Sequence, residues 1–344
     1  NEKKQLRIKT RRNELIDGYR YYDYKIFKAV KYLPYFLSDQ MGLINQKYNL
    51  VEVYINGESR GLYFEQEKID ESFLRKNKLM PTNIYKGENH ANEFFIGLNR
   101  NLFNNPNLWS KISIFNQENE NSSEDLSRFL KLLKSNKFYS DPTIDDNIDI
   151  EYFSKFDAFL TITKNFHHDY FHNMRLVLDP WSGKVTQLMV DPTLSSMEKF
   201  DLDFSVNDLG TFLNKNTNYI HEKYKWIYHF LTKEDVIEKV KLHKEKIKKD
   251  LSIVQKKEPY FVRSQDHNKE IEKYVSLLEI NKKKFLKILN SNPISSWNKN
   301  TKNFDISIND FTPLCNLKIE FKNEQPPEWI GIDLNYDNKI TKNE

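Results

Sequence analysis

The hydrophobic and polar positions along the chain predict strands near its start. Residues 51–55 and 61–67 are two runs rich in β-branched and aromatic side chains, and the turn between them begins with Asn56-Gly57. Asn-Gly is typical of a tight hairpin turn, because both central residues of such a turn need a positive φ. The pattern therefore predicts a β-hairpin, and the alternation in residues 6–12 predicts an opening strand before it.

Further along the chain, apolar residues recur at helical spacing and short apolar runs are bounded by turn residues. Helices are predicted in residues 24–37, 69–77, 124–135 and 150–166. Strands are predicted in residues 82–88, 174–179 and 185–191, the last two joined by a turn at 179–183. Two long charged helices, expected to pack antiparallel, are predicted in residues 233–257 and 269–290. Runs typical of strands follow at 304–308 and 317–321, which predicts a small β extension.

Composition adds that the core is aromatic and that nucleic acid is not the expected partner. The chain has 24 Phe, 19 Tyr and 5 Trp but only 9 Gly, and its formal net charge is +4. So small and dispersed a charge does not indicate a nucleic-acid-binding surface. The single cysteine, Cys315, excludes an internal disulfide framework and a cysteine-rich zinc site. We expect no membrane span in this segment, and because the chain begins with Asn we expect a segment to precede it.

The run HHDYFHN at residues 167–173 follows a predicted helix, and a strand, a turn and a second strand then lead to Asp191. A loop aspartate such as Asp169 can accept a proton from an attacking hydroxyl, and a nearby asparagine, Asn173, can hold a metal ion. An aspartate at the end of a later strand can bridge that ion to phosphates, because Mg²⁺ and Mn²⁺ prefer oxygen ligands. A lone aspartate in a turn usually bonds its own backbone. It is the ordered set that indicates phosphoryl transfer.

Three sequence blocks occur in one order, VEVYINGESRGLYFEQEKIDESFL, NIYKGE and HDYFHNMRLVLDPWSGKVTQLMVD. Together they resemble the spore-coat CotH protein kinase family over about residues 7–203. The resemblance implies an α+β, atypical protein-kinase-like fold. In this fold a kinase domain at residues 1–295 has a β-rich N-terminal lobe at about 1–95 and a helical C-terminal lobe at about 96–295. Residues 296–344 would form the small β extension.

The resemblance also implies an activity and assigns residues to it. The activity is transfer of the ATP γ-phosphate to Ser or Thr of a protein substrate, with Mg²⁺ or Mn²⁺. Asp169 would be the general base, and Asn173 and Asp191 would hold the metal ion. Lys86 would grip phosphate, with Glu67 as its acidic partner. We expect a monomer with a protein substrate. The sequence does not identify the compartment, and it is compatible with a protein that is secreted, at the bacterial cell surface or associated with a coat.

Several positions depart from kinase patterns. There is no G-x-G-x-x-G around the hairpin turn, so a covering loop would have to use side chains such as Ser59 and Arg60; otherwise the glycines there only make a turn. Glu67 precedes Lys86, the reverse of the order in ordinary protein kinases. Where the family commonly has a second aspartate after the metal-binding one, this chain has Thr193.

Alternatives stay open on the sequence alone. Asp201 and Asp203 could replace the missing aspartate or, as DLD, serve a metal-dependent glycosyltransferase. Lys9 or Arg11 could meet the phosphates in place of Lys86. The histidines of the loop could form a transition-metal site or could pack beneath an active loop, the latter being favoured because no H-E-x-x-H is present. The main rival function is a catalytically weak pseudokinase or a surface or coat interaction module.

Overall fold

The computed structural model describes ten stretches of the chain: residues 4–11, 13–88, 101–113, 122–135, 143–195, 202–203, 205–257, 264–291, 294–298 and 303–307. The chain divides into two units, Asn1–Thr312 and Pro313–Glu344. All described residues belong to the first unit. Cys315 and the strand expected at 317–321 therefore lie outside the described residues.

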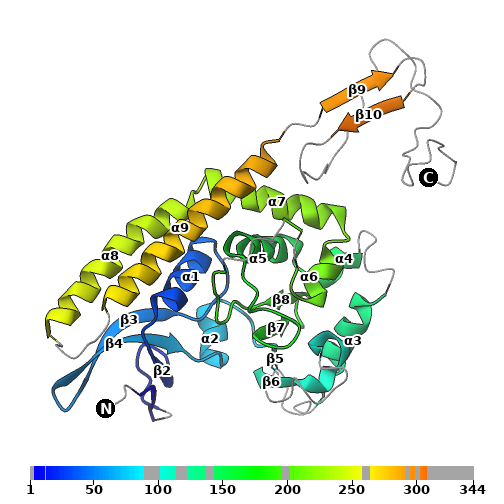
Figure 1. Cartoon of the computed structure of the whole chain (residues 1–344). Coiled ribbons are helices and arrows are strands. Elements are labelled where there is room, and N and C mark those ends of the chain that lie inside the picture. The colour runs from blue at the N-terminus through cyan, green and yellow to red at the C-terminus, as the bar shows by residue number, and fades with distance from the viewer. Residues whose placement is uncertain are drawn as a thin grey trace. The chain divides into compact units, whose positions relative to one another are not determined.

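The first sheet contains the predicted hairpin. Strands β3 (Tyr48–Ile55) and β4 (Glu58–Glu67) pair antiparallel, and Asn56 and Gly57 between them have φ of 52° and 81°. Strands β2 (Tyr21–Ile26) and β1 (Leu6–Lys9) complete a sheet of order β1-β2-β4-β3 (Figure 1). The hairpin and the opening strand are confirmed, because their signals are local turn chemistry and alternation.

The helix predicted at 24–37 is wrong in its first part. Residues 24–26 belong to β2, which pairs with β4, and the helix α1 runs over Ala29–Gln40. The aromatic run before α1 fits either a strand or a helix by its pattern. Residues 24–26 form a strand because they pair with β4, and strand formation depends on cross-strand packing more than on intrinsic preference.

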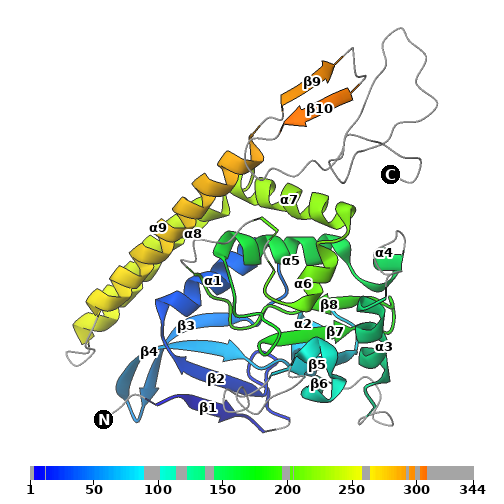
Figure 2. The ribbon, with the colours of Figure 1, turned by 45° about the vertical axis from the view of Figure 1, so that its right-hand side comes forward.

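The second sheet has the order β6-β5-β7-β8 and is covered on both faces (Figure 2). Its strands are β5 (Asn83–Gly87), β6 (Trp109–Ser113), β7 (Met174–Leu178) and β8 (Val185–Gln187). Alternate residues of β7 point to opposite faces: Leu176 packs with helices α3 (Glu124–Leu133) and α5 (Ile150–Thr163), whereas Val177 packs with α2 (Glu71–Lys76). Burial on both faces explains why all five residues of β7 are buried.

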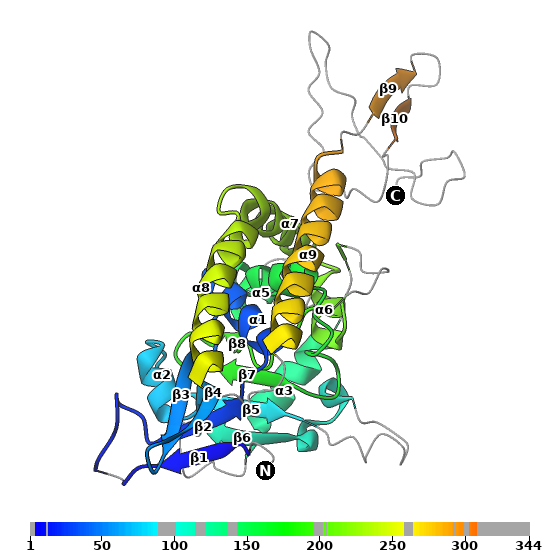
Figure 3. The ribbon, with the colours of Figure 1, turned by 60° about the vertical axis from the view of Figure 1, so that its left-hand side comes forward.

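The remaining helices form the second half of the unit. They are α4 (Thr143–Asn147), α6 (Asp208–Leu213), α7 (Thr217–Thr232), α8 (Val236–Lys257) and α9 (Ser264–Leu289). Helices α8 and α9 lie side by side, and α1 packs against them (Figure 3). Cross-links such as Lys241–Glu279 and Lys248–Glu272 run in opposite directions along the two helices, which confirms the antiparallel pair. Helices α6 and α7 were not predicted.

Strand β9 (Ile294–Asn298) pairs antiparallel with β10 (Asn303–Ser307). The run at 304–308 was expected to be a strand, and β10 agrees with that expectation. The lobe boundaries at about 95 and 295 remain predictions. Among the described helices, none combines the length and hydropathy needed to cross a lipid bilayer.

Candidate active site

The loop after α5 is organised by a buried asparagine. Helix α5 ends at Lys164, which has a left-handed φ of 49°, and the chain then turns into Asn165, which is fully buried. The Asn165 side-chain oxygen accepts hydrogen bonds from the His167 backbone N–H at 2.7 Å and from the Thr193 hydroxyl at 3.4 Å. These bonds join the loop 167–173 to the segment that follows Asp191.

Asp169 is held in place by its own loop. Its Oδ1 accepts hydrogen bonds from the backbone N–H groups of Phe171 at 2.8 Å and His172 at 2.9 Å. The His172 Nδ1 lies 2.8 Å from the same oxygen, and the Asp169 side chain is 19% exposed. The carboxylate is thus fixed in orientation by groups within three residues of it, an arrangement that short polar side chains commonly make in turns.

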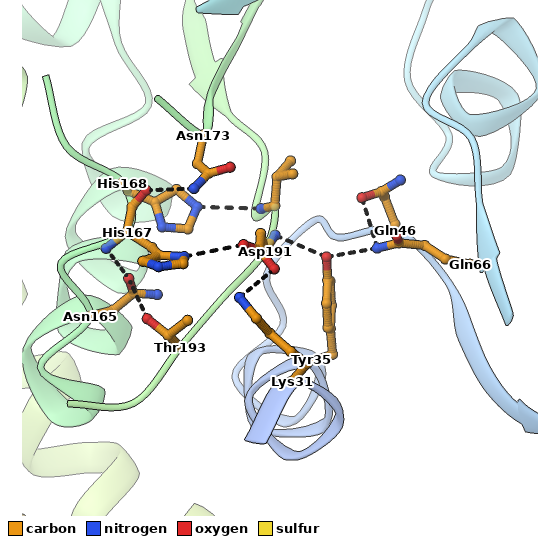
Figure 4. A network of polar contacts seen from close by, with 11 residues as sticks. Lys31, Tyr35, Gln46, Gln66, Asn165, His167, His168, Asn173, Asp191 and Thr193 are labelled. Carbon is orange, nitrogen blue, oxygen red and sulfur yellow. Dashed lines mark hydrogen bonds and ion pairs between the residues drawn. The ribbon is translucent and has the colours of Figure 1, made fainter. Parts of the chain in front are cut away.

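Asp191 lies just beyond β8, and the side chains of Lys31 and His167 contact its carboxylate (Figure 4). Oδ1 lies 2.7 Å from Lys31 Nζ, and Oδ2 lies 3.1 Å from His167 Nδ1. Burial would raise the pKa of Asp191, but hydrogen bonds from His167 and Lys31, with the charge of Lys31, outweigh it and hold that pKa well below its usual range. Asp191 is therefore a carboxylate that stays ionised.

His167 connects the two residues that were expected to hold a metal ion. Asn173 donates a hydrogen bond from Nδ2 to the His167 backbone oxygen at 3.0 Å, and the His167 ring contacts Asp191 (Figure 4). Asn173 and Asp191 both have left-handed backbone conformations, with φ of 60° and 49°. Such conformations are sparsely populated by residues other than glycine and occur often at functional sites.

Asp169 belongs to the same constellation through two histidine rings. His172 contacts Asp169, and its ring centre lies 6.0 Å from that of His167. The structure therefore brings Asp191, from the segment after β8, to Asp169 and Asn173 of the loop 167–173.

His168 supports this loop from below. It is fully buried, its Nε2 accepts a hydrogen bond from the Val190 backbone N–H at 3.3 Å, and its ring meets Phe156 edge to face. Burial lowers the pKa of His168 to about 3, so the ring is neutral. Because His168 faces Val190 while His172 faces Asp169, the two rings do not aim at one ion. The structure agrees with the packing alternative.

The structure does not pair Lys86 with Glu67. Lys86 Nζ lies 3.0 Å from Glu88 Oε2, and the same oxygen receives a hydrogen bond from Arg175 at 2.9 Å. The buried Glu67 carboxylate instead accepts a hydrogen bond from the Lys47 backbone N–H at 2.5 Å. Glu88 therefore takes the place beside Lys86 that the sequence assigned to Glu67.

Ser59 and Arg60 lie at the tip of the β3–β4 hairpin. The Ser59 hydroxyl donates to Glu52, and Arg60 pairs with Glu58. Along β4 it is Gln66, about seven residues or roughly 23 Å from Ser59, that comes near the site. Figures 1 and 2 show the hairpin tip at the end of the first sheet far from β7 and β8. The structure thus does not bring Ser59 and Arg60 to the loop 167–173.

With this geometry in view, comparisons with known proteins identify the family. A family model described as CotH kinase protein matches residues 21–252. The chain belongs to the CotH kinase family. Membership gives it a kinase-like function, and its two antiparallel sheets with the following helices form an α+β, protein-kinase-like fold. No curated protein matches the chain.

A solved structure similar to this chain is that of the Shewanella oneidensis MR-1 toxin–antitoxin system HipA, HipB and its operator DNA complex. The sequence identity is 11% and the TM-score is 0.37. The match covers 78% of this chain and 58% of that chain.

Three site residues of this CotH kinase escaped the sequence-based assignment. Lys31 and Tyr35, both from α1, contact Asp191, and His167 was considered only as a transition-metal ligand. Lys31 and Tyr35 are one helical turn apart and therefore share a face of α1. That spacing was a usable signal for a common role, but nothing in the sequence indicated which carboxylate they meet.

The residues fit a hard divalent cation held together with nucleotide. Asp191 supplies an ionised carboxylate and Asn173 an amide oxygen, since Asn173 uses its amide nitrogen to bond His167. Within the described ranges, no three His, Cys, Asp or Glu side chains gather as a metal cluster. Mg²⁺ is usually held by one or two carboxylates plus substrate phosphates, so a small protein donor set suits it.

Two of the substitutes considered for a second aspartate have other hydrogen-bond partners. The Thr193 hydroxyl is buried and bonds Asn165. The Asp203 carboxylate accepts a hydrogen bond from the Tyr224 hydroxyl, and Asp201 lies outside the described residues.

Proposed function

We propose that this CotH kinase transfers the γ-phosphate of ATP to Ser or Thr hydroxyls of a protein substrate, with Mg²⁺ or Mn²⁺. The observation that supports this most strongly is the convergence of Asn173 and Asp191 on His167, next to the fixed carboxylate of Asp169. A kinase site needs these three groups close together, with the base separate from the metal ligands.

In this proposal each residue has one task. Asp191 and Asn173 would hold the cation, which would supply positive charge to neutralise the phosphate oxygens. Asp169 orients the substrate hydroxyl and takes its proton as the hydroxyl oxygen bonds to the γ-phosphorus and the bond to the ADP oxygen breaks. The hydrogen bonds from Phe171 and His172 keep the carboxylate oriented for this step.

A second candidate is a catalytically weak pseudokinase or coat interaction module. Two observations favour it. Both Asp191 oxygens are engaged, one by Lys31 and one by His167, and Thr193 stands where a second acidic residue would strengthen metal binding.

Transfer of radiolabelled phosphate separates the two candidates. Purified protein is mixed with labelled ATP, Mg²⁺ or Mn²⁺, and a serine-rich acceptor protein. We expect labelling of the protein or the acceptor, with Asp169→Asn lowering the rate by about 10²–10⁴-fold, the range for loss of a general base. Asp146→Asn, at an exposed position of α4, is the matched control and should keep the wild-type rate.

Absence of labelling with wild-type protein that still binds nucleotide would favour the pseudokinase. Absence of both labelling and nucleotide binding would favour an interaction module.

A further inference from the structure

An ammonium group contacts the proposed metal ligand Asp191. Lys31 Nζ and Asp191 Oδ1 are 2.7 Å apart, although the two residues are 160 positions apart in the chain. The Lys31 side chain is 30% exposed, so its charged end is partly sheltered and still open to an incoming ligand. The carboxylate proposed to carry the metal ion is thus paired with a lysine.

Packing of α1 fixes this contact. One turn after Lys31, the buried Tyr35 hydroxyl accepts hydrogen bonds from the Asp191 backbone N–H at 2.9 Å and from Gln66 Nε2 at 2.7 Å (Figure 4). The same face of α1 therefore holds both the backbone and the side chain of Asp191. Ordinary exposed ion pairs have no such anchor and contribute little.

A second lysine adds positive charge to the same place. Lys25, on β2, is solvent-exposed, yet surrounding protein atoms lower its pKa, and both Asp191 and Lys31 act on it electrostatically. Lys31 is thus paired with Asp191, and Lys25 adds a second positive charge that interacts with Asp191 over a longer range. A cation bound to Asp191 would displace Lys31 and leave these positive charges without their partner, so the site favours a cation that arrives with a polyanion.

We propose that Lys31 grips the nucleotide phosphates in this kinase and that its ion pair with Asp191 breaks when metal and nucleotide bind. The inference rests on the proposed ATP-dependent function. When metal and nucleotide bind, the Lys31 ammonium moves from Asp191 Oδ1 to a phosphate oxygen, and no covalent bond changes. Lys86 instead pairs with Glu88, which also pairs with Arg175 of β7.

The test measures two affinities in the full chain, one for a fluorescent ATP analogue with Mg²⁺ and one for Mn²⁺ alone. Lys31→Met should weaken binding of the nucleotide at least about 10-fold, the loss expected for a charge-assisted hydrogen bond. The same variant should bind Mn²⁺ alone a few-fold more tightly, because the competing ammonium is gone. General structural damage would weaken binding of both nucleotide and Mn²⁺. Weaker nucleotide binding together with tighter Mn²⁺ binding would therefore indicate loss of the phosphate contact.

Two further variants control this test. Lys28→Ala changes an exposed lysine at the N-terminal end of α1 whose side chain caps no backbone group, and it should match wild type in both affinities. Lys31→Arg keeps the charge but not the compact ammonium, so its nucleotide affinity should lie between those of wild type and Lys31→Met. The proposal requires this order of nucleotide affinities. The order also tests the proposal if Lys31→Met is less stable than wild type.

The inference is overturned if Lys31→Met, or Lys31→Arg where Lys31→Met does not fold, binds nucleotide as wild type does. Loss confined to Lys86→Met would move the role to Lys86. Wild-type protein that binds Mn²⁺ but no nucleotide would instead overturn the proposed function, and the inference with it.

Discussion

At the scale of single residues, two buried ionisable groups make stability depend on pH in opposite directions. Burial lowers the pKa of His168 to about 3, and burial raises the pKa of Glu67 to about 7 despite a hydrogen bond from the Lys47 N–H. Their ordinary values in an unfolded chain are 6.5 and 4.5. In the folded protein the charged form of each group is disfavoured. Each group therefore lowers stability at pH values where it is charged in the unfolded chain.

For His168 the loss occurs in acid. Below pH 6.5 His168 becomes protonated in the unfolded chain, whereas in the folded chain it stays neutral down to about pH 3. The contribution of His168 to stability therefore falls as the pH decreases from 6.5 to about 3. We expect a loss of about 2 kcal/mol between pH 7 and pH 5 from this group. Urea unfolding of wild type and His168→Gln at both pH values checks it, because glutamine retains an acceptor for the Val190 N–H but does not titrate. An equal pH dependence in both proteins would contradict the prediction.

For Glu67 the loss occurs as pH rises. Between about pH 4.5 and pH 7 the unfolded carboxyl releases its proton while the folded one retains it, so stability falls through this window. Glu67→Gln keeps an oxygen to accept from Lys47 and should raise the free energy of unfolding at pH 8 by about 1–3 kcal/mol, with little change at pH 4. Guanidinium unfolding at the two pH values measures this. A variant that is less stable at pH 8 than wild type would show that ionised Glu67 has a partner in the fold.

At the scale of elements, α1 determines where Asp191 lies. Tyr35→Phe removes the hydroxyl that accepts from the Asp191 N–H and from Gln66, leaving two sheltered donors without this acceptor. We expect a loss of about 1–3 kcal/mol in the free energy of unfolding, since an unpaired buried polar group is costly. Tyr228→Phe, on an exposed face of α7, is the control and should change stability little. Equal stability of the two variants would show that the α1 contact does not matter.

At the scale of the whole molecule, a nucleotide site between elements should couple binding to stability. α1, the loop after α5 and the segment after β8 meet at Asp191 and must all be in place for ligand to bind. Mg²⁺ with ATP at about 100 times its Kd should add about 2.7 kcal/mol to stability and raise the melting temperature by roughly 4 °C. EDTA or Asp191→Asn should abolish the shift in scanning fluorimetry, and a shift that survives both would place the nucleotide elsewhere.

Local chemistry was predictable from the sequence. The Asn56-Gly57 hairpin follows from two positive φ angles, and the Asp169 turn follows from bonds to N–H groups two and three residues on. The order of Asp169, Asn173 and Asp191 pointed to a kinase-like site, and the family comparison confirms the family. Each of these signals lies within a few residues or in the order of short blocks, which the chain carries whatever its packing.

Only the tertiary structure decided which charges meet. Lys31 reaches Asp191 across 160 positions, Glu88 rather than Glu67 pairs with Lys86, and residues 24–26 become strand because β4 lies beside them. One lysine resembles another in sequence, and an ion pair forms wherever packing of apolar surfaces places two side chains together. The sequence alone thus determined the turns, the periodic elements and the reactive side chains that are present. The burial of the aromatic core decided which of these side chains contact one another.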